Sequence, residues 1–157
     1  MKKLCIALVA VSLLVAGCGK PEDKFIGSYK GSIEFDESSM EQLRTMAKSM
    51  GQDPSKLEEE LNSLQPSLEL KADGVCTISV KTSNGSSSVN AKWTLAEDGS
   101  TVTLHDPEMS QEDKDQAVTM GVKDLENQVF TVSEDGKTLS YTNSAMGMTA
   151  VTKFTRI

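Results

Sequence analysis

The segment Phe25-Ile26-Gly27-Ser28-Tyr29-Lys30-Gly31-Ser32-Ile33-Glu34-Phe35 alternates in polarity along its length. A period of two residues, with polar side chains on one face, predicts a β-strand that is buried on one side only. Two glycines fall on the buried face, which favours a strongly bent strand or a close approach by another part of the chain. The inward set is Phe25, Gly27, Tyr29, Gly31, Ile33 and Phe35, and only Ile26 breaks the pattern.

Residues 37–65 change to a helical period, with methionines and then leucines at helical spacing. Ser38 and Glu41 fit a capping box for the first helix, and Gly51 suits its end. Asp53-Pro54 suits the start of a second helix, with the aspartate as N-cap and the proline at the first position. We therefore expect a helical hairpin between the first two strands. Core packing is expected of its methionines, Met40, Met46 and Met50.

From residue 66 onward, short alternating segments are separated by turn-forming dipeptides. Asp-Gly and Asn-Gly pairs suit tight hairpins because both residues tolerate positive φ. Polar residues 106–125 interrupt the series, and we expect them to be partly helical. About eight strands in all predict an antiparallel up-and-down β-barrel, which leaves no free edge. All seven aromatic residues fit the inward parity, although Phe130 fits either face. The turns are Asp73-Gly74, Asn84-Gly85, Asp98-Gly99 and Asp135-Gly136.

The N-terminal segment has the layout of a secretory signal. Lys2 and Lys3 precede an apolar run of about 13 residues, which is shorter than the roughly 20 residues that span a bilayer. Its ending, Val15-Ala16-Gly17-Cys18, resembles the lipobox of bacterial lipoproteins. The resemblance implies cleavage before Cys18, a diacylglyceryl thioether on its sulfur, and acylation of the new amine. The alternative is an ordinary secretory signal with a chance cysteine.

The expected organisation is a cleaved signal (residues 1–17), a lipidated tether (18–24) and one barrel domain (25–157). Two or three acyl chains on Cys18 would hold the protein on a membrane, whereas one chain holds only marginally. Gly19 stands where some lipoproteins carry an inner-membrane retention aspartate, so the family rule favours the periplasmic face of an outer membrane. The tether reaches at most about 20 Å, and one barrel end is therefore expected to face the membrane.

Composition excludes several functions. Removal of residues 1–17 leaves 140 residues with 14 basic and 23 acidic side chains, a net charge of −9. Such an acidic domain lacks the basic patch that nucleic-acid binding needs. Cys76 is then the one cysteine besides the lipidated Cys18, so an internal disulfide is not expected. The sequence identifies no protein partner.

The domain begins with Phe25-Ile26-Gly27-Ser28-Tyr29 and closes with Phe154-Thr155-Arg156, with one helical insert and Asp-Gly hairpins between them. This layout resembles the calycin group, which comprises lipocalins, fatty-acid-binding proteins and bacterial lipocalin-like lipoproteins. In that group the first strand carries Gly-x-Trp, and a late basic residue packs across the tryptophan ring. Here Gly27 matches, Tyr29 replaces the tryptophan, and Arg156 is the corresponding basic residue, a candidate barrel-closing pair with Tyr29. The helical hairpin resembles the lid of fatty-acid-binding proteins.

The resemblance implies a small apolar ligand inside the barrel. The alternative is a filled barrel that serves as a structural or protein-interaction module through residues 38–65 or the acidic insert. An eight-stranded barrel is just wide enough for either outcome, and small inward residues such as Ala91 and Ala150 leave room for a cavity. The candidate lining residues are Tyr29, Leu68, Leu70, Ile78, Trp93, Met146, Met148 and Phe154.

Residues suited to catalysis are scarce. We therefore expect that the protein is not an enzyme and that it binds no cofactor. His105 is the one histidine, and its parity with Thr101 and Thr103 predicts an outward position at a strand end. Cys76 is expected to point inward among apolar neighbours, where a thiol is inert. Copper(I) prefers soft ligands, so the methionines together with Cys76 and His105 could bind it. We expect the methionines to pack in the core instead, and we expect no metal site.

Overall fold

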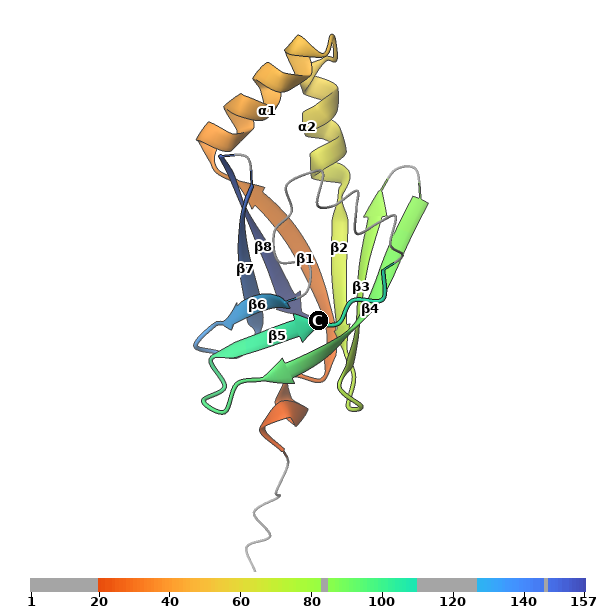
Figure 1. The fold of residues 1–157 in the computed structure, drawn as a ribbon, viewed down its shortest axis with the longest axis vertical. Coiled ribbons are helices and arrows are strands. Elements are labelled where there is room, and N and C mark those ends of the chain that lie inside the picture. The colour runs from red at the N-terminus through yellow and green to blue at the C-terminus, as the bar shows by residue number, and fades with distance from the viewer. Residues whose placement is uncertain (1–19, 83–84, 110–126, 146) are drawn as a thin grey trace, which may run out of the picture.

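The computed structural model describes residues 20–82, 85–109, 127–145 and 147–157. Within those ranges eight strands form one closed antiparallel barrel, in which each strand pairs with its neighbours in the chain and β8 returns to β1 (Figure 1). This confirms the predicted up-and-down barrel. The strands are β1 (Gly27–Phe35), β2 (Gln65–Leu70), β3 (Val75–Thr82), β4 (Gly85–Leu95), β5 (Thr101–His105), β6 (Asn127–Val132), β7 (Thr138–Ala145) and β8 (Met148–Arg156).

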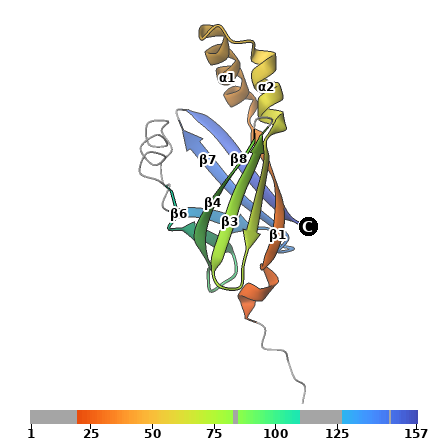
Figure 2. The same cartoon turned by 90° about the vertical axis from the view of Figure 1, so that its right-hand side faces the viewer.

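Three helical segments lie at the two ends of the barrel. The 3₁₀ helix η1 (Pro21–Lys24) lies under one end, which we call the base. The helices α1 (Glu37–Ser49) and α2 (Pro54–Ser63) form the predicted hairpin between β1 and β2, and they stand at the opposite end (Figures 1 and 2). None of the helices in the described ranges is long and apolar enough to cross a membrane.

Strand β1 pairs with β2 through its first half and with β8 along most of its length. A Cβ atom at Gly31 would lie 2.8 Å from both the Phe154 ring and Cγ of Pro66, so this position has room for hydrogen only. The close approach that the inward glycines indicated is therefore made by side chains of β8 and β2.

A continuous apolar core fills the basal part of the barrel. Phe130, whose face the sequence left open, points inward with 2% exposure. Its ring centroid lies 5.3 Å from that of Tyr141 and 5.8 Å from that of Phe154, within the range of favourable aromatic pairs. The buried cluster is Phe25, Tyr29, Leu68, Leu70, Cys76, Ala91, Trp93, Val102, Leu104, Phe130, Leu139 and Phe154.

The start of α1 differs from the predicted capping box. Strand β1 runs to Phe35, and Asp36 is still extended. The Asp36 carboxylate accepts a hydrogen bond of 2.6 Å from the backbone N–H of Ser39. The helix therefore begins at Glu37, and the prediction of Ser38 as its cap is wrong. At the second helix the prediction is confirmed, because Asp53 caps α2 and Pro54 is its first residue.

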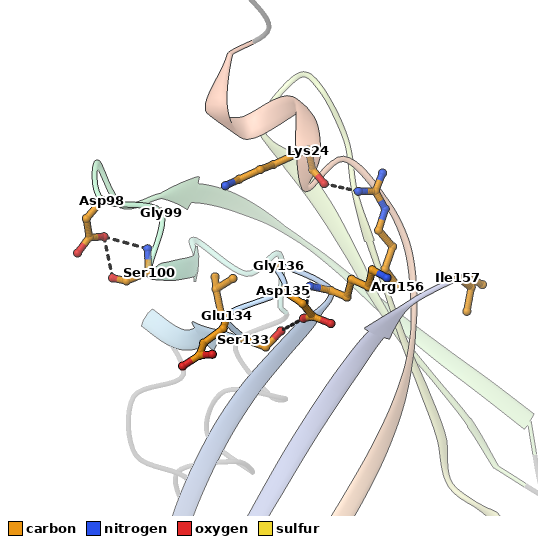
Figure 3. Close-up of a pocket in the computed structure, with 12 residues that line it drawn as sticks. Lys24, Asp98, Gly99, Ser100, Ser133, Glu134, Asp135, Gly136, Arg156 and Ile157 are labelled. Atoms are coloured by element: carbon orange, nitrogen blue, oxygen red, sulfur yellow. Dashed lines mark hydrogen bonds between the residues drawn. The ribbon is translucent and has the colours of Figure 1, made fainter.

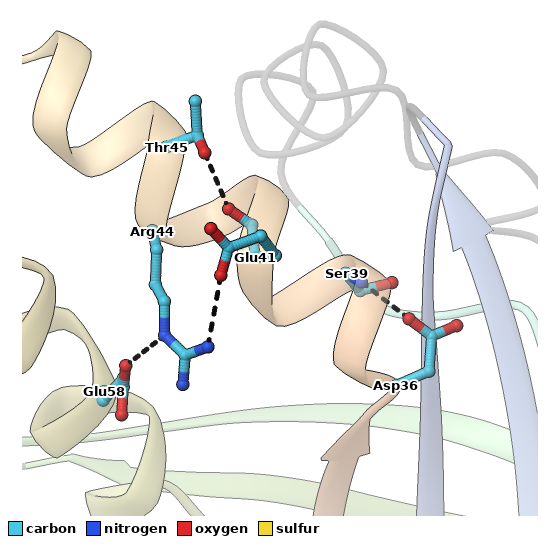
Figure 4. Close-up of polar contacts among 6 residues, drawn as sticks. All are labelled: Asp36, Ser39, Glu41, Arg44, Thr45 and Glu58. Atoms are coloured by element: carbon cyan, nitrogen blue, oxygen red, sulfur yellow. Dashed lines mark hydrogen bonds and ion pairs between the residues drawn. The ribbon is translucent and has the colours of Figure 1, made fainter.

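The helical hairpin is attached to the barrel through α1. The hydroxyl of Ser39 accepts a hydrogen bond of 2.7 Å from the backbone N–H of Thr149 in β8. Arg44 on α1 forms an ion pair of 2.6 Å with Glu58 on α2 and a longer one with Glu41 (Figure 4). The hairpin extends beyond the barrel along the long axis of the molecule, as Figures 1 and 2 show.

This placement exposes Met46 of α1 and Met50, the residue that caps its C-terminal end. Met46 is 38% exposed and Met50 is 65% exposed, so the expectation that they pack in a core is wrong. The helical spacing did identify one face of α1. The C-terminal part of that face lies beyond the barrel, where it has no core to pack against.

Candidate functional site

An apolar cavity of about 260 Å³ lies inside the barrel, at the end away from η1. We call it the distal cavity. Ile78 and Val89 face each other across β3 and β4, and Leu104 faces Gln128 across β5 and β6. Leu104 belongs to the core itself. Ile78, Val89 and Gln128 each lie one inward position farther from the base than a core residue of the same strand. The described lining is Ile78, Val80, Ser87, Ser88, Val89, Ala91, Leu104, His105, Pro107, Met109 and Gln128.

Small side chains on β4 leave space for the cavity. Ser87, Val89 and Ala91 occupy the inward positions of β4 here, whereas Trp93 fills the next inward position toward the base. None of the described lining residues is Phe, Tyr or Trp. Six of the seven aromatic side chains belong to the basal core or pack against it, whereas Phe35 lies at the distal end of β1, opposite Ala150 of β8. The hollow part of the distal end is the part that β3, β4, β5 and β6 line.

His105 lies on the outward parity of β5, as the sequence predicted, opposite Lys92 of β4, and it is half-buried at the rim of this cavity. The chain turns at Asp106, which has φ of 52°, and Glu108 donates its backbone N–H to the carbonyl of Asn90, so residues 106–109 run back along β4. Asp106 Oδ2 lies 3.3 Å from His105 Nδ1 and 3.2 Å from Lys92 Nζ. Hydrogen bonds from Lys92 and then from His105 lower the pKa of the Asp106 carboxyl.

The contact with Asp106 favours one tautomer of the neutral His105 ring. An ionised carboxylate only accepts hydrogen bonds, so Nδ1 carries the proton in the neutral ring and Nε2 is left as an acceptor. Ser87, Ser88 and Gln128 add neutral hydrogen-bonding groups to the lining. The distal cavity therefore combines an apolar wall with a few neutral polar groups, the composition usual for small-molecule pockets.

The predicted lining residues divide into two groups. Ile78 lines the distal cavity, whereas the other described and buried members belong to the packed core nearer the base. Met148 is half-buried on β8, and Met146 lies outside the described residues. Contact of any of them with a ligand stays a prediction. The core members are Tyr29, Leu68, Leu70, Trp93 and Phe154.

Tyr29 and Arg156 are direct cross-strand neighbours between β1 and β8. The Tyr29 hydroxyl donates a hydrogen bond of 2.7 Å to the carbonyl of Phe25, and burial raises its pKa while the charge of Arg156 opposes that rise. The Arg156 guanidinium donates to the carbonyl oxygens of Lys24 and Ile26. Arg156 therefore joins the last strand to the chain that leads into the first.

A second, polar recess opens at the base and has a volume of about 770 Å³ (Figure 3). We call it the basal cleft. The β4–β5 turn, the β6–β7 turn, Lys24 and the end of β8 line it. Asp98 bonds to Ser100, and Asp135 bonds to Ser133 and to the backbone N–H of Lys137, so both carboxylates serve their own turns. Those hydrogen bonds lower the pKa of each aspartate.

Cys76 is fully buried in the core and unpaired, as its inward parity predicted. Burial raises the pKa of its thiol to about 11, which keeps it protonated and unreactive at neutral pH.

Within the described ranges, no group of three or more His, Cys, Asp and Glu side chains is placed to hold a metal ion. Cys18 and residues 110–126 lie outside the described residues.

No protein-family model matches the chain. No curated protein matches it either. Among solved structures, the chain is similar to Echinococcus granulosus fatty-acid-binding protein 1, with 13% identity, a TM-score of 0.40, and 86% of this chain and 98% of that one covered. It is also similar to a Schistosoma mansoni fatty acid binding protein in complex with arachidonic acid (16% identity, TM-score 0.41, 87% and 98% covered). A third similar structure is that of Caenorhabditis elegans lipid binding protein 8, with 14% identity, a TM-score of 0.39, and 86% of this chain and 96% of that one covered.

Proposed function

We propose that this protein is a lipid-anchored lipoprotein of the bacterial cell envelope whose barrel binds a small apolar ligand in the distal cavity. The observation that carries the binding proposal is the cavity itself. Val80, Val89 and Leu104 present apolar surface to a hollow volume in a barrel whose basal part is filled by the core. Filling such a volume removes apolar surface from water, which contributes about 25 cal/mol per Å².

The size of the cavity limits the ligand. At about 260 Å³ it falls slightly below the range of roughly 300–1,000 Å³ typical of pockets for drug-sized molecules. The ligand is therefore a compact apolar molecule or one arm of a larger lipid. Met109 in the wall has an unbranched, adaptable side chain that can adjust to the shape of such a guest.

The anchoring proposal rests on Val15-Ala16-Gly17-Cys18 and on the signal that precedes it. By the lipoprotein sorting rule, Gly19 favours the periplasmic face of an outer membrane. Replacement of Cys18 with Ser tests the anchor. We expect an uncleaved or soluble product in place of a detergent-extracted one. Unchanged detergent partitioning of the Cys18→Ser protein would contradict the lipid anchor.

Ligand binding is tested with the apolar fluorescent probe N-phenyl-1-naphthylamine and two matched variants. Val89→Phe places a ring in the distal cavity, whereas Thr94→Phe places the same ring on the outer face of the same strand. We expect the wild type and Thr94→Phe to bind the probe and Val89→Phe to lose at least tenfold in affinity. Equal binding by all three proteins would place the probe elsewhere, and the cavity would not be its site.

One observation favours a second function, an interaction module for another envelope protein. Met46 on α1 and Met50 at its C-terminal cap expose apolar surface on a hairpin that extends beyond the barrel. Surface cysteines in residues 38–65 that carry a photocrosslinker would trap such a partner in cells. A wild-type affinity for the partner in Val89→Phe would separate this function from ligand binding.

A further inference from the structure

The floor of the distal cavity lies where the cavity meets the basal core. Ala91 and Leu104 belong both to the buried core and to the cavity lining, so they mark this boundary. Gln128 lies directly opposite Leu104 in the register of β5 and β6, and the next inward residue of β6 toward the base is the buried Phe130. The side chain of Gln128 is therefore at the floor of the cavity, with apolar groups beneath it.

The side-chain amide of Gln128 has no hydrogen-bonding partner among the residues that the structure describes. In the same part of the chain, no polar side-chain atom is both fully buried and unpaired, so this amide reaches open space. Because Gln128 is on the inward face, that space is the cavity. An amide offers two N–H donors and a carbonyl acceptor, and burying them without partners is costly. A ligand that fills the cavity is therefore favoured when it brings a polar group to the floor.

No fixed charge faces the cavity from its described lining. The one titratable side chain in that lining is His105, whose Nδ1 lies 3.3 Å from Asp106 Oδ2 on the outer side of β5. Lys92, directly opposite His105, lies 3.2 Å from the same carboxylate oxygen. Glu108 accepts a hydrogen bond of 3.2 Å from the side chain of Asn90. These charged groups near the rim thus have their partners outside the cavity.

An ionised ligand is poorly held by such a floor. Moving a carboxylate from water into an apolar volume is strongly unfavourable unless a cation compensates its charge. The chain as a whole carries a net charge of −7, which also repels anions at a distance. A hydroxyl or a carboxamide group is different, because it is neutral and both donates to and accepts from an amide such as that of Gln128.

We propose that the distal cavity is selective for a neutral, hydrogen-bonding lipid, namely an alkyl chain that ends in a hydroxyl or a carboxamide, and that Gln128 determines this specificity. The polar end of the ligand lies at Gln128, and the alkyl chain runs along Ile78, Val80 and Val89 toward the rim. This inference rests on the proposed ligand cavity and is independent of the proposed lipid anchor. It separates alkyl alcohols and amides from fatty-acid anions of the same length.

The test measures how decanol, decanamide and decanoate displace N-phenyl-1-naphthylamine from the full-length protein at neutral pH, where decanoate is ionised. Val89→Phe, which fills the cavity, is the blank for binding elsewhere. Each inhibition constant is corrected for the affinity of the same protein for the probe. We expect the alcohol and the amide to bind the wild type at least about tenfold more tightly than decanoate does.

Three variants test the role of Gln128. Gln128→Leu removes the amide at similar size, so the affinity for decanol should fall about three- to tenfold, the loss of one neutral hydrogen bond. Gln128→Lys places an ammonium group at the floor, so decanoate should become the preferred ligand. Val129→Lys adds the same charge to the exposed outer face of the same strand and should keep the wild-type preference.

A wild type that binds decanoate as tightly as decanol would overturn the selectivity, and this comparison needs no variant at Gln128. A folded Gln128→Lys protein that keeps the wild-type preference would overturn the role of Gln128. Equal binding of the probe by the wild type and Val89→Phe refutes the ligand cavity and this inference with it. Loss of the probe in Val89→Phe, together with equal competition by decanol and decanoate in the wild type, refutes this inference alone.

Discussion

Nη2 of Arg156 lies 2.8 Å from the carbonyl oxygen of Ile26, and this contact joins the end of β8 to the start of β1. The guanidinium also covers Gly27, where a Cβ atom would lie 3.4 Å from Arg156 Nε, and φ of +146° suits glycine alone. Strand pairing closes the barrel from Tyr29 to Phe35. Arg156 extends this closure to the segment before β1, because its guanidinium donates to the carbonyl oxygens of Lys24 and Ile26.

Replacement of Arg156 with Gln should release the segment that leads into β1. Hydrogen bonds from a charged donor contribute about 1.5–3 kcal/mol each, so we expect the free energy of unfolding to fall by about 2 kcal/mol. Amide hydrogen exchange should accelerate for residues 23–29. Lys153→Gln on the same strand is the control, because its ion pair with Glu34 is exposed and contributes at most about 1 kcal/mol. Equal effects of the two variants would contradict the special role of Arg156.

Replacement of Gly31 with Ala should overpack the barrel. The added Cβ would lie 2.8 Å from the Phe154 ring and from Pro66, neither of which can move without displacing its own strand. We expect a loss of about 1–3 kcal/mol in chemical denaturation. The neighbouring Ser32→Ala, on the outer face of β1, should change stability by less than about 0.5 kcal/mol. An unchanged free energy of unfolding in Gly31→Ala would contradict this close contact with Phe154 and Pro66.

Ionisation of Cys76 should make the fold sensitive to alkali. The unfolded thiol loses its proton near its ordinary pKa of 9.0, while the buried thiol keeps it up to about 11. Unfolding therefore releases a proton between these values, so this contribution is fully present below pH 9 and is lost as pH rises toward 11. Compared with Cys76→Ala, the wild type should lose up to about 2 kcal/mol more between pH 8.5 and 10.5. Parallel pH profiles of the two proteins would rule this out.

Asp36 should control the attachment of α1 through its cap. The hydrogen bonds from Ser39 lower the pKa of its carboxyl below the ordinary 3.8, so the stabilisation is present at neutral pH and lost as pH falls through the lowered value. Asp36→Ala should speed amide exchange in the first turn of α1, because Ala offers no acceptor. Asp36→Asn keeps an acceptor and should restore protection while removing the acid dependence. Fast exchange in both variants would show that the charge, and not the cap, holds the turn.

Local patterns predicted most of the fold. Alternation from Phe25 to Phe35 identified β1, and Asp53-Pro54 identified the start of α2, because strand parity and helix capping are local properties. The prediction of Ser38 as a cap was wrong for a reason outside its own motif. The end of β1 is set by its pairing with β8 as far as Phe35 opposite Ala150, a contact between residues more than a hundred positions apart.

The site was harder to predict than the strands. Parity correctly pointed Tyr29, Ile78 and Trp93 inward, but it could not tell which level of the barrel was filled. That depends on how eight strands stagger around the axis, which brings six of the seven aromatic rings into or against the basal core and leaves Phe35 at the distal end. The available signal was the run of small inward residues on β4, Ser87, Val89 and Ala91, and it pointed to the hollow end.

The central claim is that the distal cavity holds an apolar guest. Native mass spectrometry of the protein, extracted gently from its own envelope and compared with Val89→Phe prepared in the same way, tests it most directly. We predict a bound species on the wild type that partitions into organic solvent and is missing from Val89→Phe. A wild-type spectrum with no adduct beyond the acyl chains on Cys18, or the same adduct on both proteins, would contradict the claim.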